Sequence, residues 1–155
     1  MSSCSFIATN FEMPEIESKA KYMTVKEAIE LVPWEKMDPN SQILFVENEE
    51  DLNELVINEG SYYDVSEYTG YPFIYEVNFG YSELRVKQLL DYLKENIREG
   101  QIIELWRVWI GHEDNALNIP YSRFNFNELS LDHLFQLYNW NHANYKEQYC
   151  IVLEK

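Results

Sequence analysis

The side chains best suited to catalysis are the consecutive residues His112, Glu113 and Asp114, together with His142 further along the chain. An imidazole titrates near neutral pH and a neighbouring carboxylate can orient it, so this group could perform general acid–base catalysis. The residues that surround His112 also have the ordinary composition of a solvated loop. The spacing alone therefore does not predict a catalytic site.

No established catalytic or cofactor motif accompanies these histidines. The sequence contains no G-x-G-x-x-G, G-x-x-x-x-G-K-[ST], H-E-x-x-H or G-x-S-x-G pattern, and its five glycines make a backbone phosphate cradle difficult to build. We therefore predict a protein that is not an enzyme and that has no cofactor and no metal site. The alternative is an enzyme or small-ligand-binding protein with an aromatic pocket near His112 or His142, lined by Trp106, Trp109, Tyr121 and Trp140.

The charge of the chain is more informative than its histidines. The 155 residues include 27 acids and 12 bases, which give a formal net charge of −15. Because like charges repel, this excess disfavours binding to nucleic acid or to an anionic membrane. Hydrophobic residues make up 46% of the chain, which is enough for a packed core.

The negative charge is concentrated in residues 37–84, which contain eleven acids, no Lys or Arg, and six of the twelve tyrosines. Carboxylates steer a basic protein towards its site, and tyrosines in a loop supply rigid contact area. Residues 61–72 have the composition of such a loop. The simpler alternative is that the acids only solvate outward faces while the tyrosines pack on the sheet. The predicted partner contacts are Glu49, Glu50, Asp51, Glu54, Tyr63, Asp64, Glu67, Tyr68 and Tyr71.

These features favour a non-enzymatic acidic module that binds a basic protein and masks its working surface. The immunity proteins of bacterial toxin systems, which neutralise basic nuclease toxins, are similar in size and charge, although no motif aligns with them. We therefore expect an inhibitor of the immunity or antitoxin type, with a basic protein such as a nuclease-type toxin as its partner. Neither nucleic acid nor a membrane is an expected partner.

The N-terminus and the two cysteines bear on the compartment. The first residues lack the basic and long apolar regions of a secretory signal, and no apolar run approaches the roughly 18 to 20 residues that span a bilayer. We therefore expect a cytoplasmic bacterial protein. Cys4 and Cys150 each lie in a short apolar run near a chain end. They are expected to be reduced core residues, and the alternative is a disulfide between adjacent terminal strands.

Hydrophobic periodicity predicts the elements that must position these side chains. Apolar or alternating runs predict strands over 4–9, 43–47, 73–79, 102–110 and 149–154, and residues 120–127 are ambiguous between loop and edge strand. Within the fourth strand, Glu104 and Arg107 should point to opposite faces. Helical patterns follow Thr24, Asn48, Ser82 and Ser130; the first ends near residue 32, and Gly60 and Gly100 are placed to end the second and third.

The order of these elements predicts one globular domain over residues 1–155. Its fold class is α+β, with a single mixed, largely antiparallel sheet of about five strands and three to four helices packed on it. A doubly wound α/β fold is the alternative, because strands and helices alternate along the chain.

Overall fold

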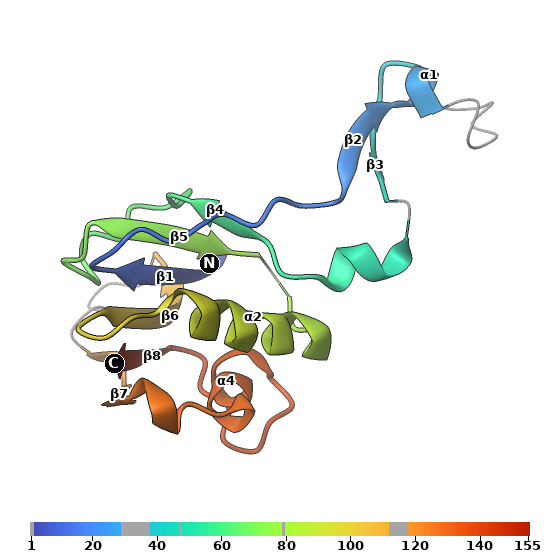
Figure 1. Cartoon of the computed structure of the whole chain (residues 1–155). Helices are drawn as coiled ribbons and strands as arrows, with labels where there is room; N and C mark the ends of the chain where they lie inside the picture. Colours follow the sequence, from blue (N-terminus) through green and yellow to red (C-terminus); the bar gives the residue numbers. More distant parts are fainter. Residues whose placement is uncertain (1, 29–37, 47, 79, 112–117) are drawn as a thin grey trace. The chain divides into compact units, whose positions relative to one another are not determined.

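A computed structural model describes residues 2–28, 38–46, 48–78, 80–111 and 118–155 (Figure 1). Their contacts divide the chain into two compact units, a smaller one of Ser18–Glu54 and a larger one of Met1–Glu17 with Leu55–Lys155. The single domain over 1–155 stays a prediction. No helix among the described residues is both long and apolar enough to cross a membrane.

Six strands of the larger unit form one sheet in the order β4–β5–β1–β6–β8–β7. Each neighbouring pair in it is antiparallel except β7 and β8, which are parallel. The mixed, largely antiparallel α+β prediction is thus confirmed, and the doubly wound alternative is wrong. The sheet has six strands instead of about five. They are β1 (Ser2–Thr9), β4 (Ile57–Glu59), β5 (Phe73–Val77), β6 (Ile102–Ile110), β7 (Tyr121–Asn125) and β8 (Tyr149–Glu154).

The additional strand, β4, lies where the acidic run after Asn48 predicted a helix. That run forms only a short 3-10 helix, η1 (Glu49–Asn53), and the chain is extended from Glu54 onwards. Leu55 and Ile57 are buried while Asn58 is exposed, which is closer to the alternation of a strand than to the stripe of a helix. Pairing with β5 therefore overrides the local helical pattern. β7 resolves the ambiguous segment as an edge strand.

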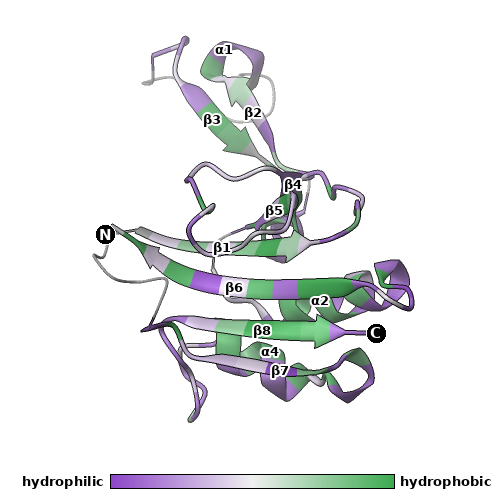
Figure 2. Ribbon diagram, turned by 90° about the vertical axis from the view of Figure 1, so that its left-hand side faces the viewer, coloured by the Kyte–Doolittle hydropathy of each residue, from purple (hydrophilic) through white to green (hydrophobic). Residues whose placement is uncertain are grey.

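Helices α2 (Glu83–Asn96) and α4 (Leu131–Tyr138) cover one face of this sheet (Figure 2). Ser82 caps α2 as predicted, since its side chain accepts a hydrogen bond of 3.0 Å from the Arg85 amide. The helix ends at Asn96, before Gly100, which has a φ of +81° in the turn that leads to β6. The described residues form three α-helices, fewer than predicted, and the third, α1 (Val25–Ala28), belongs to the smaller unit.

The sheet buries apolar side chains on both faces. On the helix side, residues such as Ile7 and Leu105 pack under α2 and α4. On the other side, Phe6, Trp106 and Cys150 lie in register on β1, β6 and β8 and belong to a second buried cluster. No α-helix of the larger unit's described residues belongs to this second cluster. A loop must therefore cover it.

The two cysteines are separated by a strand. Cys4 on β1 and Cys150 on β8 are buried and free, and β6 runs between them. Two strand spacings place β1 and β8 about 9–10 Å apart, beyond the Cα separation of about 7 Å that a disulfide can span. The disulfide alternative is therefore wrong, because the strands that carry these residues are not adjacent.

Adding a reducing agent is expected to leave the melting temperature unchanged. Burial raises the pKa of both thiols, so few thiolates form at neutral pH and alkylation should be slower than for free cysteine. Thermal unfolding with and without dithiothreitol, combined with mass spectrometry after brief alkylation, measures both effects. A lower melting temperature under reduction would contradict this placement.

The smaller unit contains a two-stranded ribbon of β2 (Lys21–Thr24) and β3 (Gln42–Phe45). The capping box predicted at Thr24 is present, because Thr24 and Glu27 each accept a hydrogen bond from the other's amide. A strand lies within the predicted 43–47, as β3, but the prediction that it is buried is wrong, since Leu44 is 49% exposed. Two strands alone leave a face uncovered. The predicted helix over 25–32 extends partly outside the described residues.

Candidate binding site

The predicted contact residues are divided between the two units. The smaller unit contains Glu49, Glu50, Asp51 and Glu54, and the larger unit contains Tyr63, Asp64, Glu67, Tyr68 and Tyr71. The second group lies in one connection, residues 60–72 between β4 and β5, which we call the tyrosine loop. The prediction of a loop over 61–72 is thus confirmed.

A lysine offsets part of the charge in the first group. The Lys19 Nζ lies 2.8 Å from a Glu54 oxygen and 3.7 Å from an Asp51 oxygen. The hydrogen bond to Glu54 is the main cause of a raised pKa at Lys19. Glu49 and Glu50 are exposed. Counting charges within residues 37–84 overlooked Lys19, because it precedes that segment in sequence and meets it only in the fold.

The tyrosine loop covers the face of the sheet that the helices leave open. The ring centroids of Phe6 and Trp106 are 5.9 Å apart and stacked, and the Tyr68 centroid lies 6.3 Å from Phe6 and 5.8 Å from Trp106. Tyr63 and Tyr71 are also half-buried against this cluster. The predicted contact tyrosines therefore stabilise the fold. Sequence reasoning omitted Tyr62, which is 86% exposed.

Two sheet carboxylates hold the loop in place. Glu104 accepts hydrogen bonds from the Thr69 hydroxyl at 2.5 Å and from the Trp106 indole at 3.2 Å. Glu76 accepts one of 2.9 Å from the Tyr62 amide. Hydrogen bonds offset the cost of placing the Glu104 carboxylate on a central strand. As predicted, Arg107 lies on the opposite face, where its guanidinium faces the Tyr145 ring at 5.8 Å.

Replacing Thr69 with valine is expected to lower the free energy of unfolding by about 1–3 kcal/mol, because Glu104 loses a donor at a part-buried position. Urea denaturation measures this loss, and limited proteolysis should show earlier cleavage in the tyrosine loop. Thr69→Ser keeps the hydroxyl and should retain most of the stability. Equal stabilities of the two variants would show that this hydrogen bond does not hold the loop.

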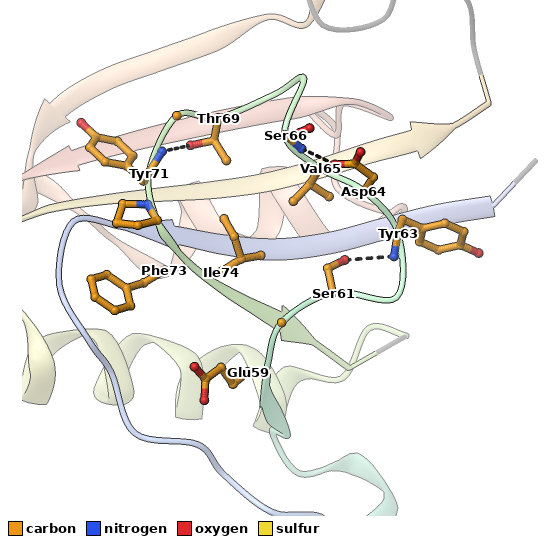
Figure 3. Close-up of a pocket in the computed structure, with 13 residues that line it drawn as sticks. Glu59, Ser61, Tyr63, Asp64, Val65, Ser66, Thr69, Tyr71, Phe73 and Ile74 are labelled. Atoms are coloured by element: carbon orange, nitrogen blue, oxygen red, sulfur yellow. Dashed lines mark hydrogen bonds between the residues drawn. The ribbon is translucent and has the colours of Figure 1, made fainter.

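The loop borders an open pocket of about 530 Å³, lined by residues within 59–74 (Figure 3). Val65 and Ile74 lie inside the arc of the loop, whereas the rings of Tyr63 and Tyr71 point away from it on either side. The polar part of the lining includes two carboxylates, those of Glu59 and Asp64. Among the residues that the structure describes, no Lys or Arg lines the pocket. It therefore combines an apolar interior with an acidic rim.

The Asp64 carboxylate on this rim is ionised at neutral pH. Its Oδ1 accepts a hydrogen bond of 2.9 Å from the Ser66 amide, and this interaction lowers the pKa of Asp64. Glu59 and Glu67 are also exposed. The loop and its border thus present three carboxylates to solvent without an intervening base. Such a surface attracts cations and basic proteins.

The residues of the alternative aromatic pocket do not share a surface. Trp106 and Trp109 are three positions apart on β6 and point to opposite faces of the sheet, so they cannot line one pocket. Tyr121 and Trp140 are 69% and 60% exposed. His112, Glu113 and Asp114 lie outside the described residues.

Both ring nitrogens of His142 are engaged. Its Nε2 lies 2.8 Å from an Asp132 oxygen, and its Nδ1 accepts a hydrogen bond of 3.0 Å from the Asn144 amide. The other described histidine, His133, accepts a hydrogen bond from the Ser130 amide at the start of α4. These contacts orient a loop and a helix end, so they do not favour a role as general base.

No family model, no curated protein and no solved structure matches the chain. The chemistry of the candidate site is therefore inferred from its own geometry. That geometry is a preformed pocket with an acidic rim. The loop that forms it is bound to the sheet through the carboxylates of Glu76 and Glu104.

Proposed function

We propose that the chain is a non-enzymatic binding module for a basic protein, and that the tyrosine loop is its main contact surface. The observation that carries this proposal is the pocket of about 530 Å³, whose described lining includes carboxylates and no basic side chain. The net charge of −15 supports it, because the field of the whole protein accelerates encounter with a basic partner and repels nucleic acid. The exposed Tyr62 adds contact area beside the rim.

The proposed outcome of binding is that the partner's basic surface is covered. A protein that acts on phosphate-rich substrates needs such a surface, so an acidic module bound there competes directly with the substrate. In its more specific form, the proposal is that the partner is a basic bacterial toxin and that the chain is its immunity or antitoxin protein in the cytoplasm. Size and charge support this form by analogy.

The proposal is tested with the purified chain and an extract of the organism from which it comes. Immobilised chain should retain a basic protein that elutes with salt, and that protein is then identified and purified. Calorimetry of the purified pair should give one-to-one binding that weakens from about 0.05 M to about 0.5 M salt. An equimolar amount of the chain should block the partner's activity. Salt-independent binding, or a partner that stays active in the complex, would refute the proposal.

A further inference from the structure

We infer that the pocket inside the tyrosine loop receives one arginine side chain of the basic partner. This inference rests on the proposed function and deepens it, because it assigns the contact to one cavity and one kind of side chain. The occupant is chosen by its fit to three properties of the pocket, which are its mixed polarity, its charge and its preformed shape.

The polarity of the pocket matches a side chain that is apolar along its stem and charged at its tip. Val65 and Ile74 lie inside the arc of the loop and can pack against methylene groups (Figure 3). Asp64 belongs to the same lining and supplies a carboxylate for the charged tip. A guanidinium bound to carboxylates makes charge-assisted hydrogen bonds, which are stronger than neutral ones.

The partly apolar interior favours arginine over lysine. A guanidinium is planar and weakly hydrated, so it enters such a cavity at a smaller cost in solvation. An ammonium is compact and strongly hydrated, so it loses more solvation on entering a partly apolar cavity. Arginine is also enriched among the side chains that dominate protein interfaces.

The pocket is built before a partner arrives. The Gly60 amide donates to the Ile74 carbonyl at 2.7 Å and closes the base of the loop. On the far side of the loop, the Thr69 hydroxyl donates a hydrogen bond to Glu104. Between these two points, the Tyr62 amide donates one to Glu76. The Cys4 thiol lies 3.9 Å from the Ser61 hydroxyl beneath the loop. Since the loop is already ordered, little conformational entropy is lost on binding.

The direct test is a titration of the full chain with N-acetylarginine amide, followed through backbone amide resonances. We expect saturable shifts confined to residues 59–74. N-acetylcitrulline amide has almost the same shape without the charge, and it should bind at least about tenfold more weakly. The lysine analogue should fall between them. Shifts spread over all acidic segments would show that the cation associates with negative charge in general, and they would overturn the inference.

Two double variants with the same charge change locate the effect. E59Q/D64N removes both carboxylates of the lining, and the asparagine can still accept the Ser66 hydrogen bond, so the loop should keep its fold. It should weaken arginine amide binding at least about tenfold. E49Q/E50Q removes two exposed charges of the smaller unit and should leave arginine amide binding nearly unchanged. Equal effects of the two variants would contradict the assignment.

The same variants separate failure of the inference from failure of the proposed function. If the purified partner binds the E59Q/D64N variant as tightly as it binds the original chain, the arginine pocket is wrong while binding of a basic protein stands. If arginine amide occupies the pocket as expected but the chain binds no basic protein, the proposed function is wrong and the pocket itself is supported.

Discussion

Replacing Phe6 with alanine is expected to lower the free energy of unfolding by about 3–5 kcal/mol, the usual cost of deleting a buried aromatic ring. Phe6 is fully buried on β1, stacks on Trp106 and lies beneath Tyr68. The cavity would open between the sheet and the tyrosine loop. Urea denaturation measures the loss, and amide hydrogen exchange should show faster exchange in residues 61–72.

Tyr62→Ala is the control for this prediction. Its ring is 86% exposed, so its removal should change stability by no more than about 0.5 kcal/mol. A stability loss from Phe6→Ala without faster exchange in the loop would show that the loop does not depend on the cluster beneath it. In that case the pocket would be held by its hydrogen bonds alone.

Neutralising the carboxylates around the pocket with E59Q/D64N/E67Q is expected to weaken binding of the basic partner about tenfold or more at low salt. The three side chains are exposed, and the segment that contains them has no base to offset their charge. Each exposed ion pair contributes roughly 0.2–1 kcal/mol, so three together reach this size. Calorimetry at several salt concentrations should also show a shallower dependence of affinity on salt.

The matched variant E50Q/D51N/E54Q removes three charges from the smaller unit. It should weaken binding less, because Lys19 already offsets part of the charge on Asp51 and Glu54. A larger loss in this variant would place the main contact on the smaller unit and contradict our proposal. If neither variant changes affinity or its salt dependence, electrostatic attraction is not what binds the partner.

Elements whose local pattern agrees with their tertiary surroundings were predictable from sequence. β5 alternates between the two faces of the sheet, and its Tyr75 and Val77 are buried on the helix side. α2 has both a capping serine and a continuous apolar stripe, so several independent signals indicated the same helix. Where several local signals agree, tertiary packing rarely overrides the element that they predict.

Features that depend on residues distant in sequence could not be predicted. The acidic run around Glu50 has helical spacing, but the segment that follows it forms strand β4 because it pairs with β5. The sequence around Tyr68 resembles that around an exposed interface tyrosine, and only the fold shows that Trp106 lies beneath its ring. The bond between Thr69 and Glu104 joins residues 35 positions apart. Local periodicity contains no information about such pairs.

The central position of β1 has a consequence for synthesis of the chain. Phe6 on β1 pairs with Trp106 on β6, so the ribosome must add 100 residues after Phe6 before these two strands can pair. At typical elongation rates of about 5–20 residues per second, β1 waits about 5–20 s before β6 can pair with it. The base-free acidic segment is made during that interval. We expect this charge to repel other nascent chains, so the residues proposed to attract a partner should also disfavour aggregation of the unfinished protein.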